Sequence, residues 1–290
     1  MVPGMNDTKA ACDALLRAMT RSRLPRDHTI LIKLGGSAME DPVATRGTLE
    51  SVVSLQTLGI RIILVHGGGK PIDRAMAAAG LVPKKVAGRR YTDDATLDIV
   101  VRTLCEEINP SIVATIRELG GRADGITANR TFPIHGETLT LDGVDLGHVG
   151  QPTRIETADL RDVIANDRIP VLPSLAVRGD GRWLNVNADT IASAVAGALG
   201  ADSAIFLTDT PGVLQDRNDP ASLLPCLSAA ECHDLIRRGI IAGGMIPKVE
   251  ACLDALREGA GRAAILDGRN PFSLLYEFVS DRPCGTKIVP

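Results

Sequence analysis

The feature that most constrains the fold is a regular alternation of short apolar runs with stretches of helical spacing. Residues 29–34 and 60–66 are rich in β-branched side chains and each run stops at glycines, which is typical of buried parallel strands. Helical stretches follow at 73–79, 94–108 and 110–119. The alternation continues with strands expected at 169–172, 204–207 and 263–266 and helices expected at 190–199, 229–238 and 247–257. Strand alternating with helix predicts a layered α/β fold, which for 290 residues we divide into two lobes.

Two segments depart from this alternation. Residues 130–149 mix alternating apolar residues with glycines and predict a β-hairpin at the edge of the first lobe. Before residue 29, the side chains of Cys12, Leu15, Leu16 and Met19 recur at the spacing of one helix face. This arm would pack either on its own subunit or on another one.

Composition and charge exclude several classes of protein. The net charge is −3, the pI is about 6.0, and no run of Lys or Arg exceeds two residues, so binding to nucleic acid or to an anionic membrane is not expected. No apolar run has the length of a membrane span and the N-terminus lacks a signal-peptide pattern, so we expect a cytoplasmic protein. The six cysteines are scattered, without a C-x-x-C pair, which indicates neither a zinc site nor a disulfide framework. Small molecules and other subunits remain as the expected partners.

Two glycine-rich turns follow predicted strands. Residues 33–37 read Lys-Leu-Gly-Gly-Ser, and residues 66–71 read His-Gly-Gly-Gly-Lys-Pro and lead into a helix. Glycines let backbone N–H groups approach an anion, and a helix N-terminus adds positive potential. Neither turn has the Rossmann or the Walker pattern, and either one alone could be only a tight turn.

Three further motifs stand at expected strand or helix ends. Residues 185–190 (Asn-Val-Asn-Ala-Asp-Thr) carry more polar side chains than a helix cap needs, and residues 207–214 pass from a strand into a turn, where α/β sheets bind ligands. Residues 243–249 place Lys248 in the first turn of a helix, where it opposes the helix dipole unless an anion offsets it. Together, the five motifs predict a site that transfers a phosphoryl group between two negatively charged oxygens.

The order of these motifs identifies a family. From Ile30 to the C-terminus, the series K-x-G-G, H-G-G-G, G-x-R-x-T, N-x-N-A-D, T-D-x-x-G and G-G-M-x-P-K-V resembles the amino acid kinase family, and within it the members that phosphorylate N-acetyl-L-glutamate for arginine biosynthesis. The resemblance implies an α/β fold that is an open three-layer αβα sandwich with a mainly parallel central sheet. It also implies a helical extension at 1–28, an N-terminal lobe at 29–188 for acetylglutamate binding and dimerisation, and a C-terminal lobe at 189–290 for ATP.

The resemblance assigns the catalytic roles to three charged residues. Lys33 and Lys248 would neutralise the charge that spreads over the transferring γ-phosphoryl group, and Asp189 would lie between them and hold both. The acceptor is a glutamate-type carboxylate, which in water has a pKa of about 4.3 and is already ionised at neutral pH, so no general base is needed.

The resemblance also implies the binding residues. Gly36 and Gly68 would contact the transferring phosphoryl group, and Arg90 would pair with the substrate α-carboxylate, with Arg89 as the alternative. The substrate-binding set is Gly36, Gly68, Gly69, Arg90, Asn185 and Asn187. The ATP-binding set is Gly35, Asp209, Thr210, Pro211, Gly212, Val213, Leu214, Ile240, Ile241 and Ala242. Mg²⁺ would be carried by the ATP phosphates, and no protein-bound metal is predicted.

Regulation and assembly are less uniform within the family. Arginine-inhibited members form hexamers through an N-terminal helix and bind arginine through a histidine and a glutamate. In this sequence Glu277 is present, Phe272 stands at the position aligned with the histidine, and Pro283 replaces a usual glycine. We therefore expect only a weak effect of arginine, and a homodimer that the arm could extend to a hexamer.

Two alternative functions share these motifs. One is a kinase for a glutamate or aminoadipate linked to a carrier protein, and the other is a catalytically silent sensor of the same fold. The presence of Lys33, Asp189 and Lys248 counts against the sensor, because binding alone does not need both lysines.

Overall fold

The structure is a computed structural model of the 290-residue chain. It describes residues 28–35, 39, 41–86, 88–127, 132–141, 143–279 and 283–290. The expectations for the N-terminal arm and for Gly36 therefore lie outside the described residues.

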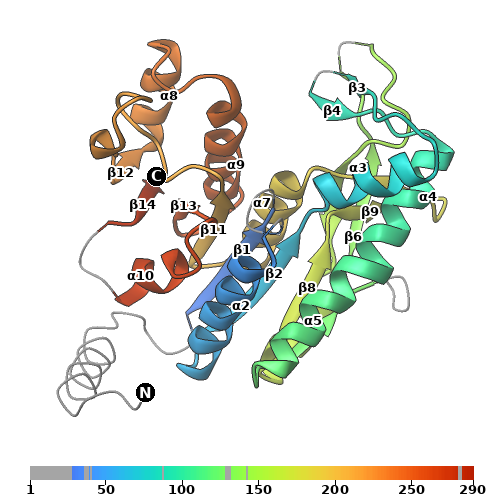
Figure 1. Ribbon diagram of the computed structural model, residues 1–290, viewed down its shortest axis with the longest axis horizontal. Helices are drawn as coiled ribbons and strands as arrows, with labels where there is room; N and C mark the ends of the chain where they lie inside the picture. The colour runs from blue at the N-terminus through green and yellow to red at the C-terminus, as the bar shows by residue number, and fades with distance from the viewer. Residues whose placement is uncertain are drawn as a thin grey trace.

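Eight strands form the central sheet, in the order β12-β14-β13-β11-β1-β2-β8-β5 (Figure 1). Their bounds are β1 Thr29–Leu34, β2 Arg61–His66, β5 Ala123–Gly125, β8 Ile169–Pro173, β11 Ser203–Thr208, β12 Cys226–Ser228, β13 Ala263–Asp267 and β14 Gly285–Val289. Neighbouring strands are parallel except for β13 and β14, which are antiparallel. The sheet is therefore mainly parallel, as the sequence predicts.

The central strands are buried on both faces, which explains their continuous apolar sequences. Every residue of β11 is buried, and in β1 the side chains of Ile30, Leu31 and Ile32 have no exposed surface. Lys33 is a half-buried lysine in this apolar strand. A lysine in such a place needs a charged partner, because burying an unpaired charge is costly.

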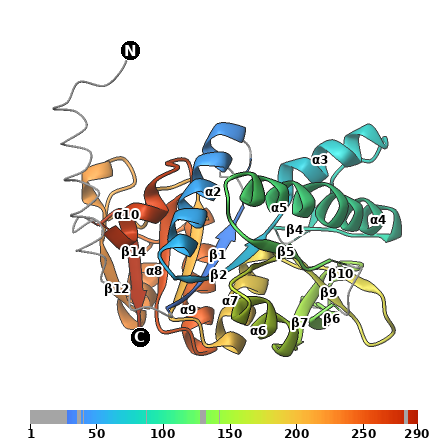
Figure 2. The same ribbon diagram turned by 90° about the horizontal axis from the view of Figure 1, so that it is seen from below.

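Helices cover both faces of the sheet, which confirms the three-layer arrangement (Figure 2). One face carries α2 (Pro42–Thr57), α5 (Asn109–Glu118) and α10 (Ser273–Val279), and the other carries α6 (Ala158–Ala165), α7 (Ala188–Leu199) and α9 (Ile246–Arg257). The other α-helices of the described residues are α3 (Gly69–Ala78), α4 (Asp94–Arg102) and α8 (Ala229–Arg237). Among the helices of the described residues, none has the length and apolar character needed to cross a membrane.

A second, smaller sheet lies beside the β5 end of the central one, in the order β10-β9-β6-β7. Its strands are β6 (Ile134–Thr138), β7 (Gly150–Ile155), β9 (Leu175–Val177) and β10 (Trp183–Asn185). The predicted hairpin corresponds to β6 and β7, which pair antiparallel, but its second strand begins only at Gly150, beyond the predicted range. A further hairpin joins β3 (Lys85–Val86) to β4 (Arg89–Arg90).

One helix differs from its prediction. The stretch 94–108 is α-helical only as far as Arg102, and Thr103–Ile108 forms a π-helix that runs directly into α5. The backbone hydrogen bonds of a π-helix join residues five positions apart, one more than in an α-helix, so the side chains that follow are rotated. Helical periodicity in the sequence does not reveal this change, because an apolar face continues through both segments.

Helix α7 packs closely against α9. The Ser193 hydroxyl donates to the Ala251 carbonyl at 2.8 Å, and a Cβ added at Gly197 would lie 2.5 Å from the Glu258 carbonyl oxygen. Gly197 therefore lets the end of α9 approach α7 closely.

Gly197→Ala should lower the free energy of unfolding by about 1–3 kcal/mol, because the added methyl group overlaps the Glu258 backbone. Intrinsic helix propensity alone predicts the opposite sign, a gain of about 1 kcal/mol. Urea unfolding measures the change, and Ala198→Gly at the exposed neighbouring position is the control for propensity. A more stable Gly197→Ala protein would contradict the close approach of the two helices.

Candidate active site

The candidate site lies where the central parallel strands end. Lys33 is in register with Val65 of β2 on one side and with Phe206 of β11 on the other. The chain leaves β2 into the glycine turn at residues 67–69 and leaves β11 into the turn at 209–214. Lys33 therefore stands between the two turns that the sequence assigned to different ligands.

Lys33 has a charged partner on α7. Its Nζ lies 2.8 Å from Oδ1 of Asp189, and the two side chains are 14% and 20% exposed. The N-cap residue Asn187 accepts a hydrogen bond from the Asp189 backbone N–H at 2.7 Å, which fixes Asp189 in the first turn of the helix. The pair joins the end of β1 to the start of α7.

A small polar pocket of about 250 Å³ lies on the β2 side of Lys33. Its lining consists of Lys33, Gly35, Gly67, Gly68, Gly69, Ile72, Gly88, Arg89, Arg90, Val149, Ser174, Asn185, Val186, Asn187 and Ala188. All the predicted substrate-binding residues that the structure describes are in this set. Gly35, which the sequence assigned to ATP, lies here as well and not in the larger pocket described below.

Arg90 is held firmly at the wall of this pocket. Its guanidinium donates to Asp73 at 2.6 Å and to the Gly69 carbonyl at 3.2 Å, and its side chain is only 11% exposed. The Asn185 amide donates to the Thr92 hydroxyl at 3.0 Å. Arg90 is therefore fixed against the glycine turn, and Arg89 lines the same pocket.

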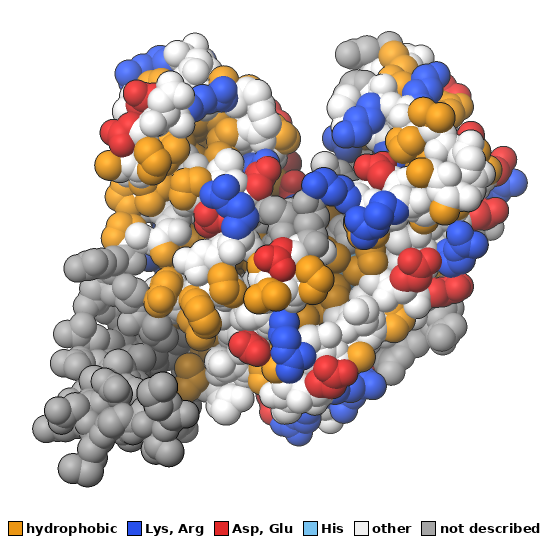
Figure 3. Space-filling view, in the orientation of Figure 1, with side chains coloured by type: hydrophobic (Ala, Val, Ile, Leu, Met, Phe, Trp, Pro, Cys, Tyr) orange, Lys and Arg blue, Asp and Glu red, His pale blue; other side chains and the backbone are white. Residues whose placement is uncertain are grey.

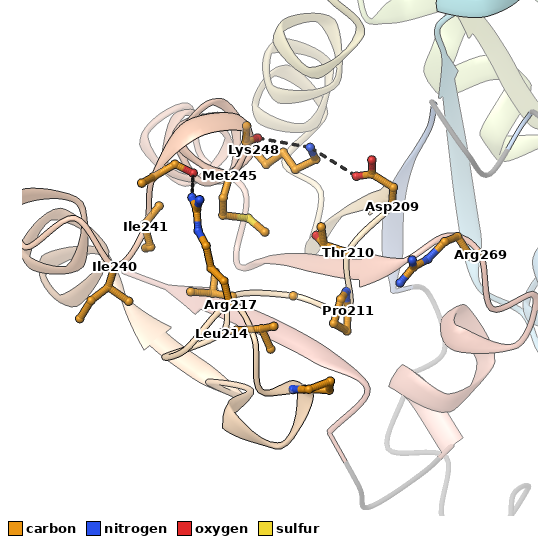
Figure 4. A pocket seen from close by; sticks show the side chains of 15 residues that line it. Asp209, Thr210, Pro211, Leu214, Arg217, Ile240, Ile241, Met245, Lys248 and Arg269 are labelled. Atoms are coloured by element: carbon orange, nitrogen blue, oxygen red, sulfur yellow. Dashed lines mark hydrogen bonds and ion pairs between the residues drawn. The ribbon is translucent and has the colours of Figure 1, made fainter.

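A larger pocket of about 730 Å³ lies on the β11 side (Figure 4). Its lining consists of Asp209, Thr210, Pro211, Gly212, Val213, Leu214, Arg217, Pro220, Ile240, Ile241, Ala242, Gly244, Met245, Lys248 and Arg269. The nine residues that the sequence assigned to ATP in segments 209–214 and 240–242 are all present. Figure 3 shows the hollow between the two parts of the molecule, with charged side chains at its floor.

Strand β14 holds the turn that forms one wall of the larger pocket. The Thr286 hydroxyl accepts from the Val213 backbone N–H at 2.8 Å. Gly212 has a φ of 140°, and a Cβ there would lie 2.7 Å from that same hydroxyl oxygen. Only glycine fits this backbone conformation beside Thr286.

Lys248 faces the larger pocket from the start of α9. Its Nζ lies 3.6 Å from Oδ1 of Asp209 and 3.3 Å from the Gly244 carbonyl oxygen (Figure 4). Burial acts to raise the pKa of Asp209, but the hydrogen bond from Thr208 and the nearby Lys248 ammonium outweigh it and lower that pKa. The resemblance implied that Asp189 holds both Lys33 and Lys248. In the structure Asp189 pairs with Lys33, whereas Lys248 pairs with Asp209, at the end of β11.

Several lining residues were not found from the sequence. Arg217 donates to the Ala242 carbonyl oxygen. Arg269, just beyond β13, forms a bidentate contact with Asp267, the last residue of that strand. Arg269 follows a predicted strand, and α/β sheets bind ligands at the ends of parallel strands, so its position in the sequence is a signal for a place in the site. Arg217 lies in an irregular loop, and no spacing in the sequence connects it with residues 240–242. Among the described residues, no group of three or more His, Cys, Asp or Glu side chains is placed to hold a metal ion.

Comparison with known proteins identifies the fold and the family. The profile of the amino acid kinase family matches residues 28–267. The chain belongs to the amino acid kinase family. Acetylglutamate kinase from Methanocella arvoryzae is 38% identical over 97% of this chain and 99% of its own length. Acetylglutamate kinase from Prochlorococcus marinus is 40% identical over 90% of this chain and 85% of its own length.

A solved structure shares the amino acid kinase fold. N-acetylglutamate synthase from Neisseria gonorrhoeae, crystallised with coenzyme A and N-acetyl-glutamate, superimposes with a TM-score of 0.84. It is 24% identical in sequence, and the match covers 96% of this chain and 63% of that one. At this identity the likeness shows the fold alone.

His66, the last residue of β2, should give this amino acid kinase a pH-dependent stability. Complete burial lowers the pKa of His66 from 6.5 to about 4. Between these values the unfolded chain binds a proton that the folded chain excludes, so the free energy of unfolding falls as the pH drops from about 6.5 to about 4. Above pH 6.5 this contribution is constant.

Chemical denaturation of the wild type and of His66→Gln across pH 4–8 measures this effect. The slope between pH 6.5 and 4 should be smaller in the variant, which carries no titrating group at this position. Equal slopes in the two proteins would contradict the burial of a neutral imidazole.

Proposed function

We propose that this chain transfers the γ-phosphoryl group of ATP to the side-chain carboxylate of N-acetyl-L-glutamate, giving N-acetyl-L-glutamyl 5-phosphate and ADP. The observation that carries the proposal is the likeness to acetylglutamate kinases, which at 38% identity extends over 97% of this chain. The site agrees with this chemistry, because a small polar pocket and a larger one lie on opposite sides of Lys33.

The catalytic demand of this reaction is electrostatic. The acceptor carboxylate is ionised at neutral pH, so it attacks without a general base, and negative charge spreads over the phosphoryl oxygens in the transition state. Lys33, held by Asp189, and Lys248, held by Asp209, supply positive charge from the two pockets. Asp189 acts by orienting Lys33, since its Oδ1 lies 2.8 Å from the Lys33 Nζ.

The smaller pocket is assigned to the acetylated amino acid. Its volume of about 250 Å³ suits a small ligand, and Lys33, Arg89 and Arg90 give it the positive charge that a dicarboxylate requires. Arg90 is the proposed partner of the α-carboxylate, because Asp73 and the Gly69 carbonyl already hold its guanidinium in place. Asn185 and Asn187 line the same wall.

The larger pocket is assigned to ATP. Apolar side chains such as Ile240, Ile241 and Met245 offer a surface for the adenine ring, and Lys248, paired with Asp209 after β11, is the proposed partner of the phosphates (Figure 4). The Thr210 hydroxyl oxygen is buried and has no hydrogen-bond partner among the described residues, so a polar ligand atom would satisfy it. Mg²⁺ would enter with the phosphates and be held chiefly by them.

The division into lobes and the assembly belong to this proposal. Residues 29–188 would bind the acetylated amino acid and form the dimer contact, and residues 189–290 would bind ATP. Residues 1–28 would serve as the arm that can join dimers into a hexamer.

The direct test is ADP release by the purified protein with Mg-ATP and N-acetyl-L-glutamate, compared with glutamate, aspartate and N-acetyl-aminoadipate. Turnover with N-acetyl-L-glutamate well above the other three is expected. No turnover with any free amino acid, from folded protein that still binds ATP, would overturn the proposal in favour of a carrier-linked acceptor or a sensor.

Arginine should have little effect on this turnover. Phe272 is 48% exposed and lies near Tyr276, with ring centroids 6.4 Å apart, so it offers no polar group to a ligand. Glu277 is buried and already faces Lys287 at 3.3 Å. The same assay with added arginine measures the effect. Half-inhibition at micromolar arginine would contradict this prediction of weak sensitivity.

A further inference from the structure

The glycine turn at residues 67–69 is backed by a buried imidazole whose hydrogen bonds determine its tautomer. His66 has no exposed surface, and its Nδ1 lies 3.2 Å from the Gly67 carbonyl oxygen. Its Nε2 lies 3.1 Å from Nδ2 of Asn109, a residue that is 1% exposed. Both ring nitrogens therefore have a partner inside the protein.

The Asn109 amide can be oriented in only one way. Its Nδ2 also lies 2.9 Å from the Val171 carbonyl oxygen, which can only accept a hydrogen bond. The amide NH₂ therefore donates one hydrogen to Val171 and the other to Nε2 of His66. Since Nε2 accepts, the ring proton is on Nδ1, and Nδ1–H donates to the Gly67 carbonyl.

This hydrogen bond fixes the direction of the next peptide N–H. No cis peptide bond is present among the described residues, and in a trans peptide the C=O and the following N–H point in opposite directions. Holding the Gly67 carbonyl toward His66 therefore turns the Gly68 N–H away from His66. Gly68 lines the smaller pocket, and its N–H has no acceptor among the described residues.

The π-helix supplies the rest of the support. A Cβ at Gly68 would lie 2.8 Å from Cδ2 of Leu104 and 2.9 Å from Cδ1 of Ile108, so both side chains pack directly behind the turn. Asn109 is the residue that follows this π-helix. The π-helix thus positions both the apolar side chains behind the turn and the Asn109 amide that orients His66.

We propose that His66 and Asn109 are positioning residues for the kinase reaction: Asn109 holds His66 as the neutral Nδ1–H tautomer, and His66 aims the Gly68 N–H at the transferring phosphoryl group. This inference rests on the proposed function. Neither residue touches the ligand. They act through the backbone of the glycine turn, which must be oriented before the transition state forms if its N–H is to stabilise the developing charge.

Two substitutions of His66 separate this role from simple filling of the core. His66→Asn places an amide nitrogen near the position of Nδ1 and can keep the donor to Gly67, whereas His66→Gln keeps a polar group near Asn109 and loses that donor. We expect kcat to fall about 10–100-fold in His66→Gln and only a few-fold in His66→Asn. KM for N-acetyl-L-glutamate should change much less than kcat, because the N–H acts on the phosphoryl group in the transition state.

His233→Gln, at an exposed position on α8, is the control and should leave kcat unchanged. Equal losses of kcat in His66→Asn and His66→Gln, in parallel with their losses of thermal stability, would overturn the positioning role. A rescue by asparagine without a matching rescue of stability would support it.

The tautomer is measured independently of activity. Long-range ¹H–¹⁵N correlation spectra of the histidine-labelled wild type at pH 7 should show His66 protonated on Nδ1, and Asn109→Asp should move the proton to Nε2 or add a second one. A wild-type ring protonated on Nε2 would overturn the inference. If the wild type fails to phosphorylate N-acetyl-L-glutamate, the proposed function falls, and the tautomer measurement alone decides whether the turn is held as described.

Discussion

The ion pair between Lys33 and Asp189 is the interaction on which the rest of the site depends. It joins the end of the central strand β1 to the first turn of α7, at a distance of 2.8 Å and with both side chains largely shielded from water. In such surroundings an ion pair interacts more strongly than at the surface, and loss of one partner leaves a charge that water solvates poorly. The pair therefore fixes both the proposed catalytic cation and the relative placement of a strand and a helix.

The parallel sheet explains why the two pockets lie at the same end of the central strands. β1 lies between β2 and β11, so the turns that follow these neighbours lie on either side of Lys33. Each turn is supported from behind by a different part of the chain. Thr286 on β14 holds the turn of the larger pocket, and His66 with Asn109 holds the glycine turn of the smaller one. Both turns contain glycines that line the pockets, and the groups that hold the turns lie in the core.

The sequence predicted the layers and the mainly parallel sheet, because strands that end in glycines and helices that begin with polar residues are local patterns. Through the resemblance to the family it also named many of the residues that line the two pockets. It did not predict the π-helix, since apolar periodicity does not distinguish it from an α-helix. Nor did it reveal the pairing of Lys248 with Asp209, or the roles of Arg217 and Asn109, which depend on contacts between segments far apart in the chain. His66 was recognised only as part of a glycine motif, because its burial and its hydrogen bonds appear only in the folded chain.

The measurement that tests the central claim most directly is the turnover of Lys248→Ala with Mg-ATP and N-acetyl-L-glutamate. Loss of a charge that acts mainly in the transition state should lower kcat by a factor on the order of a hundred or more, with a much smaller change in KM for the acetylated amino acid. Arg257→Ala, at the other end of α9 and paired with Asp254 at the surface, is the matched control and should keep full activity. Unchanged turnover in folded Lys248→Ala would contradict the assignment of phosphoryl transfer to the charged residues between the two pockets.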